Sequence, residues 1–358
     1  MRLSRGRILG VSANVFFLGL VSFLTDVSSE MVFTLLPLFL LNVLGAGPAL
    51  IGLIEGVGEA TSTSLRLASG WLSDRLGKRK GLTAVGYSLS TVAKPFLYLA
   101  HSWGMVLGVR FADRLGKAIR TAPRDALLAD SSLPGERGRS FGLHRALDSY
   151  GAVVGLGIAA LVVFMSQRGA VALAEGTFRT LVLIAIVPAV LAVVVLLSLV
   201  SEAAPRTPVP TAPEAAPIPR RFHIFLGVMV VFTLGRLSDA FLVLRAQNLG
   251  LSTFNILLLF ILFNLVYANL SVVAGRLSDR VGRRVVLVLG WASFALIYLG
   301  LAGAQRPWQV MALLVLYGVC YGSTEGVGRA MVADMVGRQR RGTGYGFYHG
   351  VVGFAAQI

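Results

Sequence analysis

Two copies of one short polar stretch interrupt the apolar runs of this chain. Residues 70–80 read GWLSDRLGKRK, and residues 275–285 read GRLSDRVGRRV. The copies share Gly, Leu, Ser, Asp, Arg, Gly and a second Arg at matching positions. A weaker echo relates LLADSSLPGERGRSFGLH, which begins at residue 127, to MVADMVGRQRRGTGYGFY, which begins at residue 331. Self-similarity of this kind predicts a chain built from two related halves.

The segments between these stretches are apolar enough to cross a membrane. Hydrophobic residues make up 55% of the 358 residues, charged residues only 14%, and the net charge is +16. A soluble domain needs a more polar surface, whereas an apolar helix of about 20 residues spans a bilayer. The sequence therefore predicts an all-α polytopic membrane protein with spans near 12–42, 49–73, 81–101, 103–122, 138–165, 178–200, 222–246, 253–277, 285–304, 307–336 and 342–358.

Lysine and arginine gather in alternate connections between these spans. The connections at 2–7, 75–80, 137–139, 206–221, 280–284 and 338–341 hold most of them, and the others hold only Arg168, Arg179, Arg245 and Arg306. The positive-inside rule then predicts a multi-pass protein of the cytoplasmic (inner) membrane with a cytoplasmic N-terminus. Topology explains the positive charge, so a nucleic-acid partner is not expected. The first span, which continues without a small-residue cleavage site, is not a signal peptide.

The Pro/Ala-rich stretch SEAAPRTPVPTAPEAAPIPRR, residues 201–221, divides the chain. It is typical of an extended linker, here a cytoplasmic one. We therefore expect an N-terminal six-helix bundle at 1–200 and a second bundle at 222–358.

The repeated stretch resembles a family signature. Gly70-x-Leu-x-Asp74-Arg75-x-Gly77-Lys-Arg79 is similar to the loop 2–3 motif of the major facilitator superfamily, and the second copy occupies its loop 8–9 position. The resemblance implies two pseudo-symmetric bundles around a central cavity and transport by alternating access. It also implies that the aspartates hold the cytoplasmic sides together in the outward-facing state. The implied gating residues are Gly70, Asp74, Arg75, Gly77, Arg79, Gly275, Asp279, Arg280, Gly282 and Arg283.

A simpler interpretation makes both copies short turns. Glycine permits a positive φ there, and aspartate accepts from helix-terminal N–H groups or a nearby arginine. The family usually has twelve spans, whereas this sequence ends in YGFYHGVVGFAAQI within the eleventh. We therefore expect a truncated sequence with about 11 of 12 spans and an incomplete second bundle.

The fourth span carries a stripe of cations. In RFADRLGKAIRTAPRDALLAD, residues 110–130, helical periodicity places five of them on one face: Arg110, Arg114, Lys117, Arg120 and Arg124. Arg110 and Arg114 fall near the bilayer centre, where a charge must face a cavity or a partner. Arg110 also stands where the family has an arginine linked to proton coupling. Asp113 takes the polar place of that motif, and Arg114 replaces its first glycine.

Intramembrane acids suggest a route for protons. Our proton-coupling candidates are Asp26, Glu30, Arg110 and Asp113, and our substrate-binding candidates are Arg110, Arg114, Lys117, Arg236, Glu325 and Arg329. The cations are expected to attract a negatively charged solute. The alternative is an internal ion-pair network that fixes helix packing, in which Glu55, Glu59, Arg66, Arg145, Asp148 and Asp239 also take part.

The function that these patterns favour is secondary active transport of a small solute, coupled to protons. Efflux is one direction, although GAVVGLGIAA places Leu156 where the drug-antiporter motif has proline. Alternatives are uptake or exchange of an organic anion, and a membrane sensor or inactive truncated transporter. No metalloprotease or hydrolase motif supports an enzyme, and His144 with Asp148 is expected to be structural. The single cysteine, Cys320, excludes an internal disulfide. We expect no cofactor or metal, and a monomer whose partners are the bilayer, the solute and protons.

Overall fold

The computed structural model describes residues 6–167, 173–202, 218–234 and 253–355. A two-stranded antiparallel hairpin, β1 (Arg7–Ile8) and β2 (Val11–Ser12), precedes the helices. The first seven helices are α1 (Ala13–Phe33), α2 (Leu36–Asn42), α3 (Pro48–Leu76), α4 (Arg79–Ala93), α5 (Trp103–Ser131), α6 (Arg137–Gln167) and α7 (Glu175–Leu199). The remaining helices are α8 (Arg220–Leu234), α10 (Thr253–Val281), α11 (Arg283–Gly303), α12 (Pro307–Met335) and α13 (Arg341–Ala355). Short 3-10 turns cover Lys94–Leu97, Pro134–Glu136 and Arg338–Arg340.

Most of the predicted spans coincide with these helices. Five segments in the described part of the chain are long and apolar enough to cross a membrane: Ala13–Asn42, Arg137–Ser166, Glu175–Leu199, Ile261–Val281 and Arg283–Gly303. Helix α5 is also long enough, since its 29 residues cover about 43 Å at about 1.5 Å per residue. Its charged residues make it less apolar than those five segments, and several of these charged residues line a cavity. The expected all-α, polytopic architecture of two helical bundles is confirmed.

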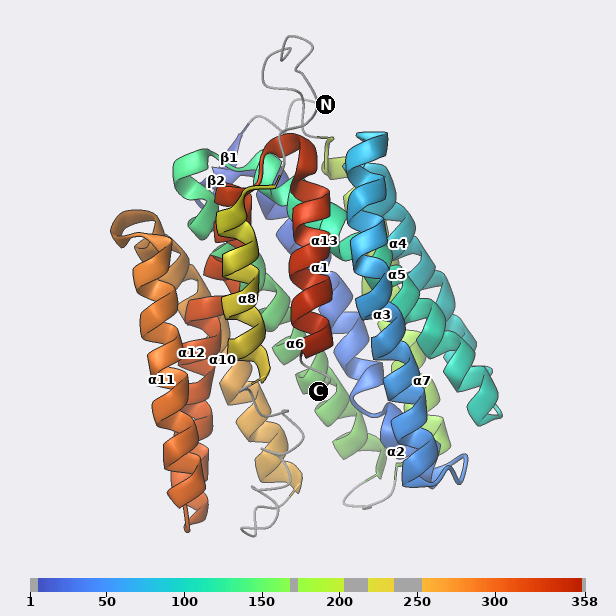
Figure 1. Ribbon diagram of the computed structural model, residues 1–358. Helices are drawn as coiled ribbons and strands as arrows, with labels where there is room; N and C mark the ends of the chain where they lie inside the picture. The colour runs from blue at the N-terminus through green and yellow to red at the C-terminus, as the bar shows by residue number, and fades with distance from the viewer. Residues whose placement is uncertain (1–5, 168–172, 203–217, 235–252, 356–358) are drawn as a thin grey trace.

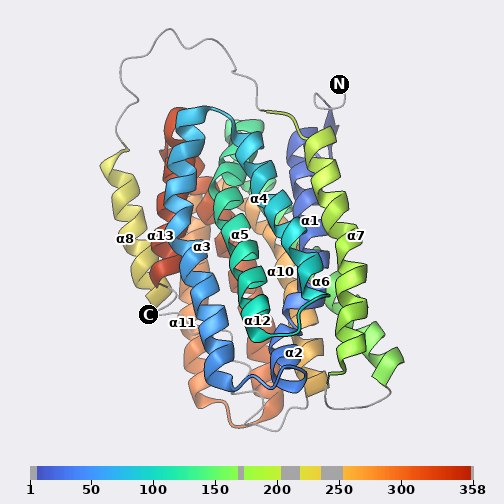
Figure 2. The ribbon, with the colours of Figure 1, turned by 90° about the vertical axis from the view of Figure 1, so that its right-hand side faces the viewer.

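Two pairs of helices join the N-terminal helices α1–α7 to the C-terminal helices α8–α13. Helix α6 packs along α10, and α3 packs along α13, side by side as Figure 2 shows. Glycines bring the backbones into contact. A Cβ added at Gly70 would overlap the carbonyl oxygen of Gly342, and one added at Gly275 would overlap that of Gly138. Larger residues there would force the halves apart.

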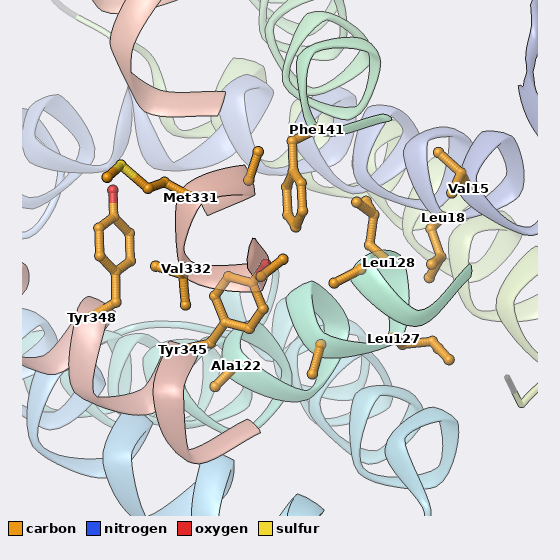
Figure 3. Packing of buried hydrophobic residues seen from close by; sticks show 14 of the residues in the cluster. Val15, Leu18, Ala122, Leu127, Leu128, Phe141, Met331, Val332, Tyr345 and Tyr348 are labelled. Atoms are coloured by element: carbon orange, nitrogen blue, oxygen red, sulfur yellow. The ribbon is translucent and has the colours of Figure 1, made fainter. Parts of the chain in front are cut away.

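The hydrophobic core between the halves lies at the end of the molecule that carries the β1–β2 hairpin (Figure 1). Figure 3 shows Leu128 of α5, Phe141 of α6, Val332 of α12 and Tyr345 of α13 meeting there. The rings of Phe141 and Tyr345 have centroids 5.9 Å apart, and both side chains are fully buried. Because these side chains are buried against one another, the described part of this core closes one end of the bundle interface.

Candidate functional site

Asp74 holds the first helix of the repeat to the opposite half. Its carboxylate, at the end of α3, accepts hydrogen bonds from the backbone N–H groups of Gly342 (2.9 Å) and Thr343 (2.6 Å). These N–H groups belong to the first turn of α13, where a helix has unpaired donors and a partial positive charge. Asp74 is therefore an N-cap supplied by the other half of the protein.

An ion cluster surrounds this cap. Arg79 donates to Asp74 (3.2 Å), to Asp130 and to the carbonyl oxygen of Arg338 (2.5 Å). Arg341, the first residue of α13, also pairs with Asp130. Because Arg338 and Arg341 belong to the C-terminal helices, the cluster adds charged contacts across the interface.

Asp279 makes the corresponding cap in the opposite direction. It accepts from the backbone N–H groups of Gly138 (3.0 Å) and Arg139 (2.9 Å) in the first turn of α6. Arg283 pairs with Asp279 (2.5 Å) and with Asp334 (3.0 Å). The two caps are therefore related by the pseudo-symmetry that the repeat predicts. We call the end of the molecule where Asp74 and Asp279 lie the capped end.

The other predicted gating residues divide into two groups. Gly77 and Gly282 have positive φ angles of 62° and 97° and form the turns that the sequence predicts. Arg75 instead lies over the ring of Trp71, 5.3 Å from its centroid, and Arg280 is exposed. Neither arginine has an ion pair with a described residue of the opposite half.

A cavity of about 710 Å³ lies between the halves, beyond the sealing core. Helices α1, α3, α4, α5 and α6 line it from one side, and α8, α11, α12 and α13 line it from the other. Its described lining runs from Arg124 and His349, next to the core, to Thr34 just beyond α1. The cavity is therefore closed at the capped end and extends toward the opposite end.

The predicted cation stripe of α5 faces this cavity. Arg110 pairs with Glu55 (2.5 Å), and Arg114 lies 3.4 Å from Glu59. Lys117 is exposed to the cavity and has neither an ion pair nor a side-chain hydrogen bond to a described residue. Part of the stripe is thus neutralised by α3, and part of it is open to a ligand.

Arg120 and Arg124 complete the stripe nearer the capped end. Arg120 donates to Ser90 Oγ (2.6 Å) and lies over the ring of Tyr87. Arg124 donates to its neighbour Asp125 (3.0 Å). Both guanidinium groups are buried, and each has found a partner within the N-terminal helices.

Asp125 connects the halves at the base of the cavity. This fully buried carboxylate of α5 pairs with His349 of α13 (2.7 Å) and Arg329 of α12 (3.5 Å). Arg329 also pairs with Glu325 (2.7 Å), which lies 3.4 Å from Arg145 of α6. The candidates Glu325 and Arg329 therefore belong to a network of alternating charges between the bundles.

The proton-coupling candidates lie along the same cavity. The carboxyl groups of Asp26 on α1 and Asp148 on α6 are within hydrogen-bonding range of each other. Glu30, one turn further along α1, accepts from Thr34 (2.8 Å). Asp113 is buried, 3.9 Å from Arg110. The structure brings Asp26 together with a carboxylate that the sequence assigned to internal ion pairing.

Some candidates have other positions, and some polar residues were missed. Arg236, Asp239 and Arg245 lie outside the described residues. His144 contacts Ser22 Oγ (3.1 Å), as expected of a structural histidine. Lys94, which sequence reasoning overlooked, is 1% exposed and donates to the hydroxyls of Ser28 (2.6 Å) and Ser29 (3.0 Å).

The sequence contained a signal for two of the missed groups. Lys94 is the only Asp, Glu, Lys or Arg residue of the apolar third span, and a cation within a membrane needs a polar or charged partner. Asp125 directly follows Arg124, the last cation of the α5 stripe, in the sequence. His349 has no such signal, because its partner is 224 positions away in the chain.

Comparisons with known proteins agree with this geometry. The family model described as Major Facilitator Superfamily matches residues 18–225 and 224–358. An uncharacterized MFS-type transporter, MJ1317, of Methanocaldococcus jannaschii is 33% identical over 353 residues, which are 97% of this chain and 86% of that protein.

Two solved structures share the fold at low sequence identity. The human organic anion transporter MFSD10 (TETRAN) has a TM-score of 0.75 at 16% identity, over 96% of this chain and 91% of its own. The proton:xylose symporter XylE, bound to 6-bromo-6-deoxy-D-glucose, has a TM-score of 0.74 at 13% identity, over 96% of this chain and 86% of its own. The repeated caps, the cavity between two bundles and the match along nearly the whole sequence lead to one conclusion: this chain belongs to the Major Facilitator Superfamily of membrane transporters.

Proposed function

We propose that this protein is a proton-coupled secondary transporter of a small organic anion, and that the structure is its outward-facing conformer. The observation that carries the proposal is Lys117, a cation of the α5 stripe that faces the cavity without an ion pair to a described residue. The described lining holds eight cationic and six acidic side chains, and Glu55 and Asp125, which lie behind it, also pair with cations of the lining. The cations are Arg66, Arg110, Arg114, Lys117, Arg120, Arg124, Arg145 and Arg329.

Lys117 is exposed to the cavity and has neither an ion pair nor a side-chain hydrogen bond to a described residue. Hydrogen bonds from a cation to an anion are among the strongest in proteins. A carboxylate, sulfonate or phosphate in the cavity would supply the acceptor that Lys117 lacks.

The orientation follows from charge. Most basic connections, including residues 75–80, 137–139, 280–284 and 338–341, lie at the capped end. The positive-inside rule then makes this end cytoplasmic. With the caps formed and the core sealed on that side, the cavity is accessible from outside, and breaking both caps would open it inward.

Proton coupling is supported by the carboxyl pair of Asp26 and Asp148. Two carboxyl groups in contact share a proton, because both cannot be ionised side by side at low cost. Asp148 also pairs with Arg145, which reaches Glu325 in the other bundle. Gain or loss of the shared proton changes the charge beside Arg145 and so alters a contact between the bundles. Glu30 and Asp113 are the other acids that could take part.

The test is anion-driven proton movement in proteoliposomes that contain the full chain and a trapped pH dye. Permanently charged sulfonates serve as probes, since weak acids carry protons across lipid unaided. We expect sulfonate-dependent proton flux that Lys117→Gln reduces and Asp26→Asn abolishes. Reversing the pH gradient distinguishes uptake from efflux. If no probe moves protons, or if Asp26→Asn and Glu30→Gln both leave the flux intact, the corresponding half of the proposal is wrong.

A further inference from the structure

In the described lining of the cavity, charge is distributed unequally between the two halves of the protein. Of the fourteen Asp, Glu, Lys and Arg residues in the described lining, twelve belong to α1, α3, α5 and α6. The C-terminal helices contribute only Glu325 and Arg329, which pair with each other. A ligand that spans the cavity therefore meets a charged face on one side and a different surface on the other.

The second surface is aromatic. Phe232 of α8 lies against Trp291 and Phe294 of α11, with ring centroids 5.3 Å and 5.0 Å away. All three line the cavity. Tyr317 of α12 supports Phe294 from behind, at a centroid distance of 5.2 Å. We call Phe232, Trp291 and Phe294 the aromatic wall.

Two rings of the aromatic wall, Phe232 and Trp291, are partly exposed, and Phe294, 2% exposed, is buried against Phe232. Cations cover the aromatic residues of the charged face: Arg110 lies 4.5 Å from the ring centroid of Phe33, and Arg120 lies equally close to that of Tyr87. Among the described residues, no arginine or lysine lies over a ring of the wall.

We propose that the cavity binds an amphipathic organic anion with a flat aromatic body. Its anionic group lies at the charged face, where Lys117 is unpaired. Its ring stacks on the partly exposed rings of Phe232 and Trp291. This inference rests on the proposed function and narrows it, because a small inorganic anion would leave the wall empty and a neutral aromatic molecule would leave Lys117 unpaired.

The test compares ligands that differ in one property. The probes are benzenesulfonate, hexane-1-sulfonate of equal charge, neutral benzenesulfonamide, and inorganic sulfate. Binding to the detergent-purified full chain is measured by calorimetry, and proton flux is measured in proteoliposomes. We expect benzenesulfonate to bind about two- to tenfold more tightly than hexane-1-sulfonate, since aromatic stacking adds to simple burial. Benzenesulfonamide and sulfate should bind more weakly still.

Variants assign the preference to the wall. Trp291→Leu should weaken benzenesulfonate about tenfold and hexane-1-sulfonate less than about twofold, and Trp291→Phe should keep the aromatic preference. Lys117→Gln should weaken both sulfonates alike. The matched controls are Trp308→Leu, at an exposed tryptophan, and Arg179→Gln, at an arginine outside the described lining; neither should change binding.

Two negative results have different meanings. If hexane-1-sulfonate binds and drives flux as well as benzenesulfonate, or if Trp291→Leu weakens both equally, the aromatic site is wrong while anion transport stands. If neither sulfonate nor sulfate binds or drives flux, the proposed function fails, and this inference fails with it.

Discussion

Replacing Asp74 by asparagine should open the capped end. The Asp74 carboxylate is 8% exposed and accepts two backbone hydrogen bonds from α13, at 2.9 Å and 2.6 Å. Asp74 and α13 belong to different halves, so both bonds exist only while that end is closed. The substitution therefore removes stabilisation from one conformer and leaves the other unaffected, which is the condition for a population shift.

The size of the shift follows from the two bonds. A hydrogen bond to a charged group contributes about 1.5–3 kcal/mol, so the pair contributes about 3–6 kcal/mol. Asparagine keeps one acceptor oxygen, water reaches α13 once the end opens, and Arg79 still has Asp130. We therefore expect a loss of about 2 kcal/mol, which raises the ratio of open to closed molecules about thirtyfold.

The assay is a distance measurement by pulsed electron spin resonance. Spin labels on Lys78→Cys and Gln339→Cys, in a Cys320→Ser background, report on the two sides of the first cap. The variant should show a growing population at longer distance. Glu175→Gln, which removes a carboxylate from an exposed pair with Arg179, should leave the distribution unchanged. An unchanged distribution in Asp74→Asn would refute the assignment of the cap as a closing contact.

Two further substitutions test the same interface. Gly342→Ala should also lengthen the label distance, because the added Cβ would overlap the Gly70 carbonyl, whereas Gly337→Ala has open space and should not. Asp125→Asn should lower the free energy of unfolding by about 3–5 kcal/mol, since it leaves buried cations without their partner. Glu136→Gln breaks only an exposed pair with Arg7 and should cost about 1 kcal/mol or less. Equal thermal melting of these last two variants would contradict the role given to Asp125.

The sequence by itself determined the helices and located the two aspartates of the caps. Span positions follow from runs of about 20 apolar residues, whatever surrounds them. The repeat located Asp74 and Asp279, but the helix that each of them caps belongs to the opposite half and was found only in the structure. The stripe from Arg110 to Arg124 also follows, because the period of one helix decides which residues share a face.

Tertiary structure decided which partner each of these groups has. The repeat aligns Arg79 with Arg284, yet Arg283 occupies the equivalent place, because α11 begins directly after Gly282. Arg75 and Arg280 match the motif equally well, but neither has an ion pair with a described residue of the opposite half.

The same limit applies to the cavity. The helical period shows that Arg110, Lys117 and Arg124 share a face. It does not show that Glu55 of α3 pairs with Arg110 or that Lys117 has no ion pair with a described residue. Nor does it show that Asp125 contacts His349. The first outcome depends on how α3 and α5 pack within the N-terminal bundle, and the contact of Asp125 with His349 depends on how the two bundles dock. A local pattern fixes the direction of a side chain on its own helix, and only the relative position of the helices determines what it meets.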